Sequence, residues 1–379
     1  MLPETPQDRM EKFASVYNDM INFPTTVDVA EELKISIHRV RGRASELRTL
    51  RAAGNRAIPE VIIRHAAERT VGKHMSIEAI PDAEEPIDEL IARAIVHNNK
   101  QIAHHDAKKI VDIDIFCQGP IGVAGLPDQH LNNTGTRLDL AMKHAELIQN
   151  TEGLYAIAVG DWLDNFIIGR LERERRADIM PHSDTNRIQE HYVSLIADKL
   201  VAAIGGNHND WPEMLGGHDI LGDLMRRLNK GGIYDADEIR VRLNLPGGAS
   251  FTHLVRHIFP GHSKYNTAHG VLAWMLDRWQ GEDVFWGGHI HSAAHTEIER
   301  EYMGDTRVVH GVQLSTYKVL DGYAIKRGFR KNSPFIAPMV LHLPETGKTV
   351  FFSDLEEGVE YLKFVRAEYD KKKRASVSA

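Results

Sequence analysis

Five short segments of the chain carry Asp, His and Asn side chains, and each follows an apolar stretch. The segments are Asp128–His130, Gly160–Asn165, Gly206–Asp210, a histidine near residue 257, and Gly288–His291. Carboxylate, imidazole and amide groups can together hold two divalent cations a few ångströms apart. Such a pair of cations stabilises both the attacking and the leaving oxygen of a phosphoryl displacement. The five segments, in this order, therefore predict a metal-dependent phosphoesterase.

The first two segments supply carboxylates and one imidazole. Asp128 and His130 lie two residues apart in an extended segment, so their side chains point to the same side and can contact one cation. Asp161 follows the apolar stretch that ends at Val159. A carboxylate can give one oxygen to each of two cations, and we therefore expect Asp161 to bridge them.

The third and fifth segments supply an amide and three imidazoles. Asn207 offers a neutral amide oxygen, and the adjacent His208 is left for proton transfer. His289 and His291, again two residues apart, point the same way from an extended loop. The preceding Gly288 lets the backbone and a substrate approach closely.

Several histidines lie in the interval of the fourth segment: His253, His257, His262 and His269. His257 ends an expected strand, which is the position that the other ligands take. Alternation along that strand places His253 in the core. His262 lies in the following loop, where it could reach a cation or the substrate. We expect His257 to be the ligand, with His262 as the alternative and as a substrate contact.

Apolar stretches alternate with amphipathic ones from residue 111 onward, which predicts an α/β fold with sheets inside and helices outside. Strands are expected at 111–116, 121–126, 154–159, 200–204, 250–257, 284–286, 296–302, 307–314, 338–343 and 349–353. Helices are expected at 137–149, 188–199, 221–228, 267–279 and 356–369. We divide the chain into a helical domain (1–80), a linker and amphipathic helix (81–110), a catalytic domain (111–353), and a C-terminal helix with a basic tail (354–379).

The N-terminal segment predicts a separate helical unit. Helices at 27–33 and 37–50, joined by a short turn, follow the pattern of a helix-turn-helix, and Ser36 can cap the second helix. That helix is rich in arginine, which suits contact with DNA phosphates. The candidate DNA contacts are Arg39, Arg41, Arg43 and Arg48. The alternative is a solvated basic face on a docking module.

The composition limits the class of protein. A chain of 379 residues with 42% hydrophobic and 26% charged residues suits one large folded domain and a smaller one. The formal net charge of −7 means that any contact with nucleic acid must be local. The single cysteine, Cys117, excludes an internal disulfide and fits a reducing compartment. We find no leader and no apolar run near the roughly 20 residues of a membrane span, and expect a cytoplasmic protein.

The order of the five segments resembles the calcineurin-like metallophosphoesterase superfamily. Its pattern runs Asp-x-His, Gly-Asp-x-x-Asp, Gly-Asn-His-Asp/Glu, His and Gly-His-x-His, and the match covers about 128–291. The resemblance implies a β-sandwich flanked by helices over about 111–353. The basic N-terminal segment joined to such a core is also similar to metallophosphatases of bacteriophages.

The resemblance also implies roles for individual residues. The first cation would be held by Asp128, His130, Asp161 and His291. The second would be held by Asp161, Asn207, His289 and the fourth-segment histidine. His208 would protonate the leaving oxygen, oriented by Asp164. The third segment departs from the family pattern, because Asn209 stands where an acid is usual and Asp210 follows one place later.

We therefore expect a two-metal phosphodiesterase that acts on nucleic acid, with DNA the first choice. Oxygen and imidazole ligands without thiolate admit Mn, our first choice, and Fe, Zn, Ni or Mg. Asn165 and a basic stretch are further candidate substrate contacts; the stretch comprises Lys318, Lys326, Arg327, Arg330 and Lys331. One alternative is a phosphatase or nucleotide phosphodiesterase with a small substrate. The other is a DNA-binding regulator with a structural metal domain.

Overall fold

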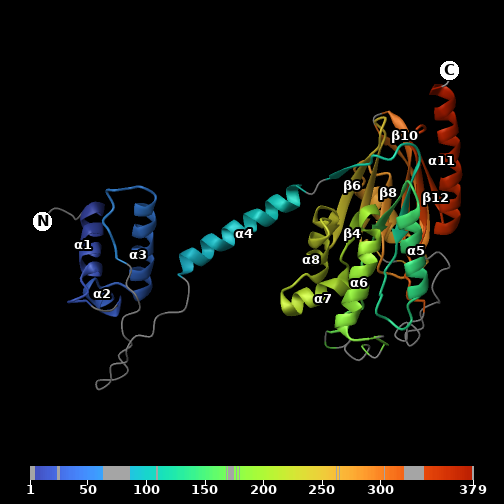
Figure 1. The fold of residues 1–379 in the computed structure, drawn as a ribbon. Coiled ribbons are helices and arrows are strands. Elements are labelled where there is room, and N and C mark those ends of the chain that lie inside the picture. Colours follow the sequence, from blue (N-terminus) through green and yellow to red (C-terminus); the bar gives the residue numbers. More distant parts are fainter. Residues whose placement is uncertain are drawn as a thin grey trace. The chain divides into compact units, whose positions relative to one another are not determined.

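The chain forms two compact units in a computed structural model, residues 1–97 and 98–379 (Figure 1). The structure describes residues 5–23, 26–62, 86–107, 110–167, 169, 175, 177–178, 180–261, 263, 265–302, 304–319 and 337–377. The boundary between the units falls within one helix, α4 (Ile87–Ala107). We describe each unit separately.

The N-terminal unit contains three helices around a small core. They are α1 (Pro6–Asn18), α2 (Thr26–Glu32) and α3 (Ile37–Ala52). Thr5 caps α1 in a capping box with Asp8, and Ser36 caps α3 by accepting a hydrogen bond from the backbone of Arg39. The buried core includes Phe13, Val29, Val40, Ala44 and Leu47. The two helices expected at 27–33 and 37–50 are confirmed as α2 and α3, whereas α1 was not predicted.

Helix α4 confirms the amphipathic helix expected at the end of the linker segment. Its apolar residues are exposed, with Ile87 64% and Ile95 54% accessible. Helix α4 has 21 residues and is the longest of the described helices that precede residue 111. Among the described helices, none combines the length and the apolar character that crossing a membrane requires.

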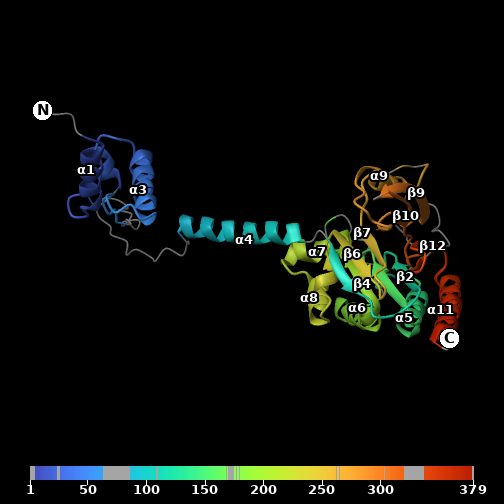
Figure 2. The same ribbon diagram turned by 90° about the horizontal axis from the view of Figure 1, so that it is seen from above.

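The larger unit is an α/β structure built on two mixed six-stranded sheets. Helices flank these strands in Figures 1 and 2. The first sheet has the order β1 (Val111–Asp114), β6 (Glu238–Asn244), β7 (Ser250–Arg256), β8 (Val284–Gly287), β10 (Asp305–Gln313) and β9 (Ala294–Tyr302). The second has the order β12 (Lys348–Phe352), β11 (Met339–Leu343), β2 (Ile121–Leu126), β3 (Leu154–Ala158), β4 (Leu200–Ile204) and β5 (Tyr234–Asp235). The α/β class expected from the alternating pattern is confirmed.

Apolar side chains on both faces of the strands form the core. One buried cluster contains side chains from both sheets, among them Val123, Ile157, Val241 and Trp286. A second cluster joins the other face of the second sheet to the helices that cover it (Figure 2). These helices are α5 (Leu138–Asn150), α6 (His182–Ile196), α8 (Ile220–Arg227) and α11 (Leu355–Val377). The first sheet packs on α9 (His269–Asp277) through Leu254, Val271 and Phe285.

Two strands and one α-helix among the described elements of this unit were not predicted. Strand β6 is the second strand of the first sheet, where it pairs with β1 and β7. The short strand β5 pairs with β4 at the edge of the second sheet. Helix α7 (Asn207–Gly216) begins within the third polar segment, where no helix was predicted.

Candidate metal centre

The polar segments lie at the carboxyl ends of strands that neighbour one another in the two sheets. Strands β2, β3 and β4 run parallel side by side, and the first three segments follow them in turn. Strands β7 and β8 are parallel neighbours in the other sheet, and the last two segments follow them. Parallel strands that sit side by side end at the same edge of a sheet, so loops from each sheet converge. The fold therefore brings together residues that lie more than 160 positions apart.

The first group of candidate ligands comprises Asp128, His130, Asp161 and His291. The Nε2 atoms of His130 and His291 lie 3.2 Å apart, and His291 Nε2 lies 3.3 Å from Asp128 Oδ2. His130 Nε2 lies 4.0 Å from Asp161 Oδ2. Neighbouring ligand atoms around a cation with bonds of about 2.0–2.1 Å are separated by about 2.9–3.4 Å. The first two of these three separations already match that spacing.

The second group comprises Asp161, His257 and His289, with Asn207 between the two imidazoles. His257 Nε2 lies 3.2 Å from Asp161 Oδ2. Asn207 Oδ1 lies 2.9 Å from His257 Nε2 and 2.8 Å from His289 Nδ1. Asp161 belongs to both groups, which is the placement that a bridging carboxylate requires.

Contacts outside the groups fix the orientation of two imidazoles. His257 Nδ1 donates a hydrogen bond to the carbonyl oxygen of Val159 at 2.8 Å, so its Nε2 faces Asp161. His130 Nδ1 lies 2.7 Å from Asp164 Oδ1, which directs its Nε2 toward the first group. Metal-binding histidines commonly use the second ring nitrogen in this way. His257 is thus the fourth-segment histidine that joins the centre, His253 is buried in the core, and His262 lies outside the described residues.

The charges of the centre are strongly coupled. Burial alone would raise the pKa of Asp161, but His257 and His208 hold it well below its usual range. Burial alone would lower the pKa of His257, but the Asp161 and Asp128 carboxylates raise it to about 9. Burial, together with the charge of Lys318, lowers the pKa of His130 to about 4. Asp128 Oδ1 is buried without a hydrogen-bond partner among the described residues. A bound cation would satisfy that oxygen, so the donor set fits a metal centre.

The backbone is strained where the ligands lie. Among the described residues, seven other than glycine have a positive φ angle, and five of these belong to the polar segments. The five are His130, Asp161, Asn165, His289 and His291, with φ between 44° and 72°. Left-handed conformations of such residues are costly and concentrate at functional sites, because the surrounding structure must hold them. The strain supports a function for this cluster beyond folding.

His208 lies beside the two groups. Its Nδ1 contacts the backbone carbonyl oxygen of Asp164, and its Nε2 lies 3.9 Å from Asp161 Oδ2. The ring of Trp211 packs on it at 4.2 Å between centroids. The expected contact between Asp164 and His208 is therefore present, but it uses the backbone of Asp164. The carboxylate of Asp164 orients His130 instead.

Lys318 and Asn133 complete the surroundings of Asp164. Lys318 is 2% exposed, and its ammonium group lies 3.0 Å from Asp164 Oδ1, while Asn133 donates to Oδ2. Of Lys318 and Asn133, only Lys318 was a candidate from the sequence, as part of a basic stretch. The other members of that stretch, Lys326, Arg327, Arg330 and Lys331, lie outside the described residues. No signal in the sequence pointed to Asn133.

Two polar side chains near His208, those of Asn165 and Asn209, form hydrogen bonds with the backbone of neighbouring loops. Asn165, a candidate substrate contact, is 6% exposed and donates to the backbone carbonyl of His208 at 3.0 Å. Asn209 accepts a hydrogen bond from the backbone of Trp162. Burial and neighbouring acids raise the pKa of Asp210 to about 6, and Asp210 is not a member of either group.

The four candidate DNA contacts differ in how their side chains are used. Arg39 and Arg41 are exposed on α3. The guanidinium of Arg43 lies 5.6 Å from the centre of the Phe13 ring, and Arg48 donates to the carbonyl oxygen of Ile62 at 3.2 Å. Arg39 and Arg41 therefore present more of their charge to solvent than Arg43 and Arg48.

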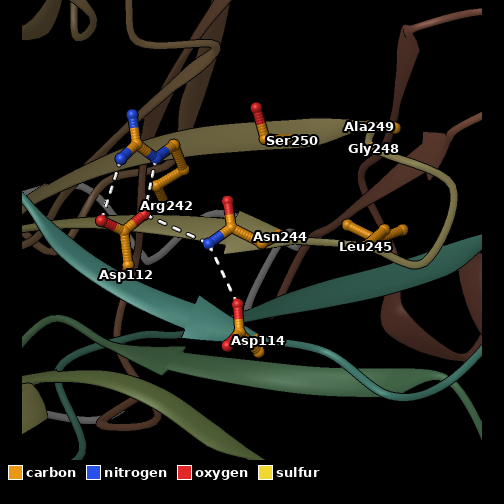
Figure 3. Close-up of a pocket in the computed structure, with 8 residues that line it drawn as sticks. All are labelled: Asp112, Asp114, Arg242, Asn244, Leu245, Gly248, Ala249 and Ser250. Carbon is orange, nitrogen blue, oxygen red and sulfur yellow. Dashed lines mark hydrogen bonds and ion pairs between the residues drawn. The ribbon is translucent and has the colours of Figure 1, made fainter.

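A pocket on the first sheet offers a contrast with the centre (Figure 3). Its acidic residues are Asp112 and Asp114. The guanidinium of Arg242 holds both oxygens of Asp112, and Asn244 bridges the two carboxylates. These acids are already partnered within the protein, so this pocket is not a second acidic metal site.

Comparison of the chain with models of known protein families gives no match, and a search of curated proteins gives none either. The arrangement of the described residues therefore carries the functional interpretation. That arrangement consists of two mostly buried Asp/His groups that could hold metal ions, joined by Asp161 and flanked by His208.

Proposed function

We propose that the protein is a phosphoesterase that depends on two divalent cations and hydrolyses phosphodiester bonds, as calcineurin-like metallophosphoesterases do. The observation that carries the proposal is the convergence of seven expected ligands from five separate segments on two groups that share Asp161. The apolar cluster that contains side chains from both sheets supports the β-sandwich of that superfamily.

The residues divide between two cation positions. One would be held by Asp128, His130, Asp161 and His291, and the other by Asp161, Asn207, His257 and His289. When bound, such a pair of cations supplies Lewis acidity and stabilises both oxygens of an in-line displacement at phosphorus. The ligands are oxygen and imidazole only, which admits Mn, our first choice, and Fe, Zn, Ni or Mg.

His208 supplies proton transfer in this proposal. The Asp164 carbonyl accepts from its Nδ1, so Nε2 faces the side of the centre where Asp161 lies. Trp211 and Phe166 pack against the ring and limit its rotation. An imidazole held in this way can donate a proton to the leaving oxygen.

His208→Ala tests that role. The variant should retain its cations and lose roughly 100-fold or more in turnover of a diester with a poor leaving group. A nitrophenyl ester should suffer less, because its leaving oxygen needs less protonation. His191→Ala, an exposed histidine on α6, is the matched control and should behave as the wild type. Equal losses on both substrates would argue against proton donation by His208.

We further propose nucleic acid, with DNA first, as the substrate. The support is the N-terminal unit, in which α2, a short turn and α3 follow the helix-turn-helix pattern and α3 exposes Arg39 and Arg41. Each arginine that contacts a phosphate releases a counterion, so binding should weaken as salt rises. Arg39→Ala with Arg41→Ala in the full chain should flatten this salt dependence of duplex DNA binding. Arg9→Ala, an exposed arginine on α1, is the control.

A substrate panel separates this proposal from its alternatives. The panel holds a nitrophenyl diester, a phosphomonoester, single- and double-stranded DNA, and RNA, each with Mn²⁺. Hydrolysis of small esters without hydrolysis of nucleic acid would favour the small-substrate enzyme and a docking role for the N-terminal unit. DNA binding without any hydrolysis would favour a regulator.

A further inference from the structure

A third group of metal-capable side chains lies away from the centre, on the hairpin of β9 and β10. It comprises His295, Glu297 and His310. His295 and Glu297 are two residues apart on β9, and His310 is the partner of Glu297 in the antiparallel register with β10. Residues two apart on one strand and partners directly opposite share a face of the sheet. The strand pairing itself therefore brings the three side chains together.

The spacing of the three groups matches a tetrahedral site. His295 Nε2 lies 3.1 Å from His310 Nδ1, and Glu297 Oε1 lies 3.6 Å from the first atom and 3.4 Å from the second. Zinc bonds of about 2.0–2.1 Å at tetrahedral angles separate neighbouring ligand atoms by about 3.3–3.4 Å. One ion placed just off the plane of this triangle could bond all three atoms with small shifts of the side chains.

We propose that His295, Glu297 and His310 form a binding site for a single Zn²⁺ ion, independent of the two-cation centre. The three ligands leave the fourth position of a tetrahedron for water, as in zinc sites with an open position. Two imidazoles and one carboxylate favour zinc over magnesium or calcium, which prefer oxygen ligands. The site shares no residue with the two-cation centre, so zinc binding here can be tested independently of the proposed phosphoesterase function.

The packing and the exposure of the three side chains suit the binding of a cation. The ring of Phe351 on β12 stacks on His295, with centroids 3.8 Å apart and planes 5° apart, and holds that imidazole in place. The His310 side chain is 3% exposed, while those of His295 and Glu297 are 21% and 52% exposed, so an ion can enter from the Glu297 side.

Glu297→Gln in the full chain is the test. The substitution keeps the size of a half-exposed side chain and removes its charge, so the protein should fold as the wild type does. Glu299→Gln is the matched control, because Glu299 is an exposed acid two residues along the same strand and lies outside the group. Zinc content after loading and gel filtration, and Zn²⁺ affinity by competition with a chromophoric chelator, are measured for the wild type and both variants.

The expected result is that Glu297→Gln binds one zinc ion fewer per chain, or binds it at least 10-fold more weakly, while Glu299→Gln matches the wild type. Asp161→Asn, which disables the centre, should keep the zinc ion that Glu297→Gln loses. Hydrolysis of a small phosphodiester should be unchanged in Glu297→Gln. Identical zinc content and affinity in the wild type and both glutamine variants would overturn the proposal and leave a hydrogen-bonded His/Glu cluster. That result would not affect the two-cation centre.

Discussion

Asp164→Asn should both destabilise the protein and weaken its first cation position. The carboxylate is fully buried, and it faces the ammonium of Lys318 at 3.0 Å and the Nδ1 of His130 at 2.7 Å. The substitution keeps the shape of the side chain and removes its charge. It leaves the buried ammonium facing a neutral amide, and it offers His130 a neutral amide oxygen in place of a charged carboxylate oxygen.

The structure sets the size of both effects. Removing one partner of a buried ion pair costs about 3–5 kcal/mol, a large part of the roughly 5–15 kcal/mol that stabilises a typical folded protein. Loss of a group that orients a metal ligand lowers metal affinity about 10–100-fold. His130, Lys318 and Asn133 hold the pKa of Asp164 well below its usual range even though burial opposes them. The carboxylate therefore stabilises the fold above about pH 4, and this contribution is lost as the pH falls below that value.

Urea unfolding and Mn²⁺ titration measure the two effects on the same samples. Asp139→Asn is the control, because it makes the same change at an exposed ion pair with Arg137, where little effect is expected. Lys318→Met should lower stability but retain metal affinity, since Asp164 and His130 remain. It also preserves the test if Asp164→Asn fails to fold. The reasoning is refuted if Asp164→Asn equals Asp139→Asn in unfolding midpoint and in metal affinity.

Three further results are expected. First, the pKa of His257 is raised to about 9 in the metal-free protein, so this imidazole must lose a proton when it binds a metal ion. Metal affinity should therefore rise about tenfold per pH unit from pH 7 toward pH 9. A metal affinity that does not change with pH in calorimetric titrations would contradict this. Gly206→Ala should weaken metal binding, since its Cβ would stand 2.6 Å from Asp161 N and Oδ1, whereas Gly217→Ala, also at positive φ but in open space, should not; equal affinities would exclude the steric effect. Asp161→Asn should lose both central cations more readily than Asn207→Ala loses the second, as measured by elemental analysis, and the opposite order would remove the bridging role.

The candidate ligands were readable from the sequence because each stands just after an apolar strand. Because neighbouring parallel strands end at the same edge of a sheet, residues that follow them lie close together. The expected contacts of His257 with Asp161 and of His291 with Asp128 are present. The expected strands 121–126 and 200–204 agree with β2 and β4 to the residue. In these places local pattern and long-range packing require the same structure.

Other features depended on contacts that no local pattern reveals. Lys318 is buried because it pairs with Asp164, which lies 154 positions away in the sequence. The local sequence, a lysine in a basic stretch, does not indicate this pairing. Helix α7 was missed because Gly206 and the polar residues after it have the composition of a turn, and Pro212 lies inside the helix. Strand β6 was missed although Ile239, Val241 and Leu243 alternate with charged residues, a pattern that does predict a strand.

Anomalous diffraction from crystals loaded with Mn²⁺ tests the two-cation centre most directly. Two peaks about 3.5–4 Å apart, with the Asp161 carboxylate between them, are expected. One peak should contact Asp128, His130 and His291, and the other should contact Asn207, His257 and His289. A single peak, or no peak within bonding distance of Asp161, would contradict the proposed centre.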